Sequence, residues 1–104
     1  MENSCADGYI FLPNAFSPNG DLLHDNFYLQ GSGLTNVNAF SVYDRWGTLL
    51  FESFNALPNI EGEGWNGKDK NGQRCNQGVY IYRYEVQCLN GDRVQGSGNV
   101  TLIR

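Results

Sequence analysis

The residues with the clearest capacity for chemistry lie in one short loop, between Ser17 and Asn26. Its Asn19, Asp21 and Asp25 carry amide and carboxylate oxygens on a tightly turned backbone, and Ca²⁺ prefers oxygen ligands of this kind. No Glu closes the loop in the manner of an EF-hand, and Asn and Asp side chains also bond to the backbone of their own turns. The loop is interpreted either as a calcium site or as a purely structural turn, and no other cofactor is indicated.

The sequence lacks the usual combinations of residues for enzymatic catalysis. His24 is the single histidine, and no Gly-x-Ser-x-Gly motif supplies a nucleophile. Glu61 and Glu63 lie in a Gly-rich stretch, where two solvated carboxylates are a commoner arrangement than a glycosidase pair. One histidine also gives no cluster with the ligand spacing of a zinc site. We therefore expect a domain that is not an enzyme.

Two tryptophans suggest a carbohydrate-binding surface as an alternative, because flat exposed aromatic rings stack on sugars. Trp46 and Trp65 each stand beside glycine in a turn-like segment. An indole in such a place more often covers the end of a core and donates its N–H to a loop carbonyl. We predict that both rings are buried.

Three cysteines, Cys5, Cys75 and Cys88, allow at most one disulfide. A bond between Cys75 and Cys88 is excluded if residues 79–88 form one extended strand, since that strand is roughly 30 Å long and bridged Cα atoms lie within about 7 Å. The remaining possibilities are three free thiols, Cys5 with Cys75, or Cys5 with Cys88. Of the two pairings we prefer Cys5 with Cys88, which would tether the N-terminal tail.

Length and charge narrow the classes of partner. A chain of 104 residues is the size of one domain. Its net charge is −4 with seven scattered Lys and Arg residues, which argues against binding to nucleic acid. No apolar run approaches the roughly 20 residues that span a bilayer, so no direct membrane insertion is expected. Met1 to Ser4 lacks the features of a signal peptide, so the protein is either cytoplasmic or a fragment of a longer secreted parent. The high content of Gly and Asn favours the fragment, and we expect an acidic monomer.

Strands, not helices, must build the fold. Four Asn-Gly pairs, at 19–20, 66–67, 71–72 and 90–91, punctuate short β-rich runs, which is typical of an all-β sandwich of about seven strands. The expected strands are 9–12, 26–30, 37–44, 48–53, 78–89 and 93–103, with a short seventh near Ala15 or Trp65. Gly47 is expected to take the left-handed position that closes a type I turn with a bulge.

The hairpin around Asn90-Gly91 raises a question of register. Alternation places Tyr80, Tyr82, Tyr84, Val86 and Cys88 on one face, which is predicted to point inward. A strict two-residue turn would then leave Val100 and Leu102 pointing outward. We therefore predict a β-bulge at 96–98 that turns the far half of the returning strand over.

Seven segments along the chain resemble a known family. They are Ile10 to Asp21 with Asp25 to Phe27, Phe40 to Gly47, Leu50 to Glu52, Gly64 to Gly67, Gly78 to Tyr82 and Gly98 to Arg104. Together they closely resemble the gliding-motility-associated C-terminal domain family, the type B sorting domain of type IX secretion in Bacteroidota. The resemblance covers nearly the whole chain, with residues 1–8 as a tail or linker and residues 9–104 as the sorting domain. Leu22 and His24 depart from the family pattern, and the loss of a glycine there weakens the calcium interpretation.

The resemblance implies an immunoglobulin-like antiparallel β-sandwich at the C-terminus of a large secreted or surface protein, often an adhesin. It implies a sorting signal that carries the cargo from the periplasm to the cell surface or medium. The implied partners are the outer-membrane translocon and a β-barrel protein of the SprF/PorP type. The alternatives are a carbohydrate-binding module and a structural spacer of an adhesin.

The recognition surface expected from the resemblance joins two segments, 13–25 and 100–104, which we expect to be exposed. The alternative is that the family shares them because the fold needs them. The candidate residues are Pro13, Asn14, Phe16, Pro18, Asn19, Asp21, Asp25, Val100, Leu102 and Arg104.

Overall fold

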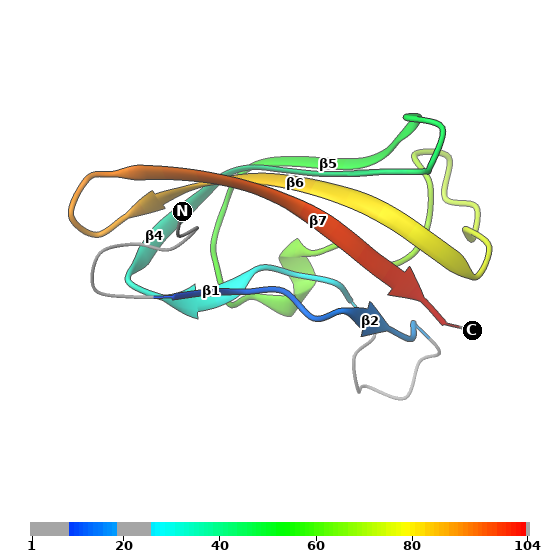
Figure 1. Ribbon diagram of the computed structural model, residues 1–104, viewed down its shortest axis with the longest axis horizontal. Helices are drawn as coiled ribbons and strands as arrows, with labels where there is room; N and C mark the ends of the chain where they lie inside the picture. Colours follow the sequence, from blue (N-terminus) through cyan, green and yellow to red (C-terminus); the bar gives the residue numbers. More distant parts are fainter. Residues whose placement is uncertain (1–8, 19–25, 104) are drawn as a thin grey trace.

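The computed structural model describes residues 9–18 and 26–103, which form an all-β domain (Figure 1). One turn of 3-10 helix, Glu61–Glu63, is the only helical element among these residues. The strands are β1 (Tyr9–Phe11), β2 (Ala15–Phe16), β3 (Gln30–Ser32), β4 (Leu34–Tyr43), β5 (Leu49–Ala56), β6 (Gly78–Cys88) and β7 (Arg93–Leu102).

The strands form two sheets that pack as a sandwich. β1 and β3 make a two-stranded sheet, and the other five follow the order β2-β7-β6-β4-β5. Figure 1 shows β1 and β3 as a layer beneath the long strands. The predicted β-sandwich of about seven strands is confirmed, with one correction: β2 runs parallel to β7, whereas the other pairs are antiparallel.

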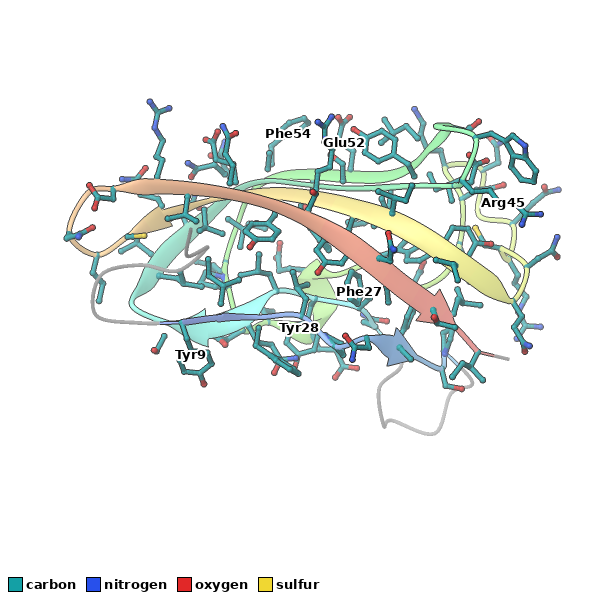
Figure 2. All side chains as sticks on the ribbon, in the orientation of Figure 1. Tyr9, Phe27, Tyr28, Arg45, Glu52 and Phe54 are labelled. Carbon is teal, nitrogen blue, oxygen red and sulfur yellow. The ribbon has the colours of Figure 1, made fainter. Side chains whose placement is uncertain are left out.

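Aromatic rings fill the core between the layers. The ring of Phe16 lies 5.7 Å from that of Phe27 and 5.3 Å from that of Trp65, measured between centroids. Trp65 is 0% exposed, and its Nε1–H donates to the carbonyl oxygen of Lys68 at 2.8 Å. The prediction that Trp65 is a buried plug is therefore confirmed, and Figure 2 shows Phe27 between the two layers.

The expected strand at 26–30 is wrong in its placement. Phe27 and Trp65 form an isolated bridge, with two backbone hydrogen bonds of 2.8 Å, and the strand begins only at Gln30. The carbonyl of Leu29 accepts from the N–H of Asn59 at 2.9 Å. This apolar segment thus pairs with loop backbone, which satisfies its hydrogen bonds without a sheet neighbour. Of the two places suggested for a short strand, Ala15 lies in β2.

The predicted bulge at 96–98 is also wrong. β6 and β7 pair without interruption, from Gly78 opposite Leu102 to Gln87 opposite Arg93. The extra residue lies in the turn instead: the Gly91 N–H donates to the Cys88 carbonyl at 3.0 Å, and Gly91 has a φ of 93°. A type I turn with a left-handed glycine shifts the register by one residue, so no bulge is needed in the strand.

Gly96 and Gly98 have a steric role in β7. In the observed register they stand opposite Tyr84 and Tyr82, whose rings lie where a Cβ on either glycine would be. The glycines therefore let the tyrosine rings lie flat across the neighbouring strand. Burial raises the pKa of the Tyr82 hydroxyl, and burial followed by the proximity of Tyr82 raises the pKa of Tyr84.

We expect Gly98→Ala to lower the free energy of unfolding by about 1 to 3 kcal/mol, because the added methyl group overlaps the Tyr82 ring. In an open strand the same change would be neutral or stabilising. Ser97→Ala, one residue away and exposed, is the matched control and should change stability by less than about 0.5 kcal/mol. Urea unfolding measures both, and a Gly98→Ala variant as stable as the parent would contradict this account.

Cys88 is buried at the end of β6 and is disulfide-bonded. Its predicted partner, Cys5, lies outside the described residues. We expect mass spectrometry of a non-reduced digest to find peptides containing Cys5 and Cys88 joined, and reduction to lower the free energy of unfolding by about 2 to 5 kcal/mol. A digest in which Cys88 is linked to Cys75, or is open to alkylation before reduction, would refute the pairing.

Candidate recognition surface

The structure joins the two segments expected to form the recognition surface. β2 lies beside the end of β7, with Ala15 opposite Thr101 and Phe16 opposite Leu102. The Thr101 N–H donates to the Asn14 carbonyl at 2.8 Å, and the Ile103 N–H donates to the Phe16 carbonyl at 2.9 Å. The residues of 13–18 and 100–103 therefore form one corner of the sandwich.

Half of the candidate recognition residues in this corner are buried and not exposed as expected. Phe16, Val100 and Leu102 are core residues, each no more than 2% exposed. Their segment was expected to be an exposed edge, but β7 has β6 on one side and β2 on the other at this end. These three side chains pack inside the fold and are not available to a partner, as expected where a family shares residues because its fold needs them.

The accessible part of the corner is smaller. Asn14 is exposed, Pro13 and Pro18 are half-buried, and Ile103 is 45% exposed. The Ser17 hydroxyl donates to the Ile103 carbonyl at 3.0 Å, which fixes the two segments to each other. The remaining candidates, Asn19, Asp21, Asp25 and Arg104, lie outside the described residues, as does the proposed calcium loop.

The prediction that Trp46 is buried is wrong. Its ring is 76% exposed, and the guanidinium carbon of Arg45 lies 4.5 Å from the ring centroid, in a cation–π contact. The turn explains why: Gly47 has the predicted left-handed φ, 88°, and its N–H donates to the Asp44 carbonyl at 3.0 Å. Trp46 is thus the second central residue of the turn, a position that projects away from the sheet. The exposure of Trp46 could have been predicted from the sequence, because a left-handed Gly47 that closes the turn puts Trp46 at its second central position.

The β4–β5 turn is stabilised by the side chain of its first residue, Asp44. One carboxylate oxygen of Asp44, Oδ1, accepts from the N–H groups of Trp46 and Thr48, both at 2.9 Å. The Asp44 N–H also donates to the Thr48 carbonyl at 3.0 Å. The backbone that presents Arg45 and Trp46 is therefore well fixed, although both side chains face solvent.

The flat aromatic strip of a sugar-binding sandwich is not formed by the candidate rings. Trp65 is in the core, and Tyr80 and Tyr84 are buried beneath the sheet. Trp46 alone among the two tryptophans presents an open ring.

Electrostatic features elsewhere have structural causes. Hydrogen bonds from Asn38 and then Gln95 hold the pKa of Glu85 below its usual range, on the outer face of the large sheet. Within residues 9–18 and 26–103, no cluster of His, Cys, Asp and Glu is arranged to hold a metal ion. In the same part of the chain no helix is long and apolar enough to cross a membrane.

The fold defines a small β-sandwich domain. Comparison with known protein families matches residues 10–102 to the CHU_C type IX secretion signal domain. Because the match spans nearly the whole chain, the protein belongs to this family. A comparison with curated proteins gives no match.

Membership of the family settles the predicted function at a general level. The domain is a type IX secretion signal, and it directs export to the cell surface or the medium. A signal of this kind interacts with the secretion machinery. The resemblance noted from the sequence motifs is confirmed.

The two tryptophans should respond differently to mutation and to quenching. We expect Trp46→Phe to change stability by less than about 0.5 kcal/mol, and Trp65→Phe to lower it by about 1 to 3 kcal/mol, because the second change leaves the Lys68 carbonyl without its indole donor. Acrylamide should quench the remaining tryptophan strongly in Trp65→Phe and weakly in Trp46→Phe. Equal quenching in the two variants would contradict the assigned burial.

Proposed function

We propose that the folded sandwich, and not a linear peptide within it, is the signal that the secretion machinery reads. The observation that carries this proposal is the place of Val100 and Leu102. Both are 0% exposed, so every second side chain at the end of β7 lies in the core. Secretion machinery that binds this domain therefore contacts a surface formed by several strands.

The proposed readers are the outer-membrane translocon and a β-barrel partner of the SprF/PorP type, as for a type B sorting domain at the C-terminus of a large surface or secreted cargo. The family match supports the machinery in general terms, and the sequence motifs support the type B assignment. The proposal assigns the domain no catalytic step. Its contribution is a folded shape and the side chains on that shape.

The test is an export assay in a Bacteroidota cell that has the type IX system. Residues 1–104 are fused behind a signal peptide and a fluorescent cargo, and surface or medium fluorescence is compared with that of a translocon-deficient strain. We expect export with the intact domain, and none when only residues 98–104 are attached to the cargo.

Two charge substitutions on β7 separate fold from local sequence. Val100→Asp places a carboxylate in the core and should cost more than about 3 kcal/mol of stability, abolishing export. Ser97→Asp adds the same charge on the exposed face and should be exported as the parent is. Export by the short peptide alone would overturn the folded-signal proposal, and retention of the intact domain would overturn its role as a sufficient signal.

A further inference from the structure

A groove of about 730 Å³ lies beside the exposed tryptophan, at one end of the sandwich. It is bounded by the β4–β5 turn, by the segment 74–78 that leads into β6, by the start of β6, and by Asn99 of β7. Figure 1 shows this turn and the start of β6 at the same end of the molecule, and Figure 2 labels Arg45 there. No residue of the proposed β2–β7 corner lines it.

Three turns within the chain show that the backbone geometry at 44–48 does not require a tryptophan at position 46. The turns at 44–48, 69–73 and 88–92 share the same pair of backbone hydrogen bonds, each with glycine in fourth place. The second central residue is Trp46 in the first, Asn71 in the second and Asn90 in the third. Asparagine therefore suits this position, and the indole makes none of the hydrogen bonds that hold the turn.

The turn at 69–73 matches the first most closely. Asp69 Oδ1 accepts from the N–H groups of Asn71 and Gln73 at 2.9 Å each, as Asp44 does for Trp46 and Thr48. The two turns thus have the same hydrogen bonds and differ in the side chains they present. A large apolar ring that is held on a fixed turn, and that shares a groove with the exposed side chains of Val79 and Ile81, is typical of a binding surface.

Charge and apolar surface in the groove indicate what it binds. Arg45 and Arg74 supply two positive charges, and the one acidic lining residue, Asp44, has an oxygen engaged by two backbone N–H groups. Val79 and Ile81 add apolar surface, 54% and 38% exposed. A cationic groove on a chain of net charge −4 suits an acidic ligand with an apolar side chain.

We propose that Arg45, Trp46 and Arg74 form the site by which this domain binds an acidic protein segment of the secretion machinery. The apolar side chain of that segment packs on Trp46, and its carboxylates pair with the two guanidinium groups. Tryptophan and arginine, with tyrosine, are enriched among the residues that contribute most binding energy to protein interfaces. This inference rests on the proposed function, because it names the part of the domain that the machinery contacts.

The test uses the full 104-residue domain on the same fluorescent cargo. Trp46→Asn installs the residue that the other two turns carry, and Arg45→Gln with Arg74→Gln removes both charges. Each variant should unfold at the urea midpoint of the parent, yet lose export by at least about tenfold, since truncation of a central interface residue weakens binding by that much or more. Leu89→Asn, in the turn at 88–92, removes another exposed apolar side chain and should be exported normally.

The outcomes distinguish this inference from the proposed function. Normal export of Trp46→Asn overturns the site, whereas the parent domain's export still tests the signal itself. Loss of export with Trp46→Asn alone, and not with the two Arg→Gln changes, overturns the acidic nature of the segment. Retention of the purified parent domain, but not of Trp46→Asn, on an insoluble polysaccharide, together with normal export of both, would make the groove a carbohydrate site and overturn the proposal.

Discussion

The parallel pairing of β2 with the end of β7 closes the sandwich, and much of the remaining structure depends on it. β2 is two residues long, yet it covers the open side of β7 where Val100 and Leu102 enter the core. The Ser17 hydroxyl reaches Ile103 across 86 positions of sequence. Ordering such a distant contact costs chain entropy before any burial is gained, so this corner forms only with the rest of the domain. The surface of this corner is therefore assembled only when both ends of the described chain have folded together.

Turns with a left-handed glycine set the register of the large sheet. In the β6–β7 hairpin the added residue at Gly91 lets Tyr80, Tyr84 and Val86 share the inner face with Val100. The strand opposite can then remain regular, and its glycines at 96 and 98 leave space for tyrosine rings. Within this hairpin the backbone conformation of Gly91 sets the register, and the small size of Gly96 and Gly98 makes room for the tyrosine rings.

The two tryptophans have opposite environments, one buried and one exposed. Trp65 fills the core, and its one polar atom is satisfied by the Lys68 carbonyl. The indole of Trp46 takes no part in the hydrogen bonds of its turn, and the ring faces water beside Arg45. The first stabilises the domain through burial of apolar area. The second leaves that area available to a partner, which is the physical basis for placing recognition at this end of the sandwich.

The sequence by itself determined the fold class, the inward face of β6, the turn at Gly47, the plug at Trp65 and the family. Each of these follows from local periodicity, turn chemistry or motifs, and such patterns can be recognised from neighbouring residues in the sequence alone. Tertiary structure alone decided that β2 pairs with the end of β7, because the sequence of one strand does not identify the strand beside it. It also decided that residues 26–29 pair with loop backbone and that the glycines of β7 accommodate rings from β6. These features depend on which segments meet in space, and pairings between distant segments are set by the packing of the whole core.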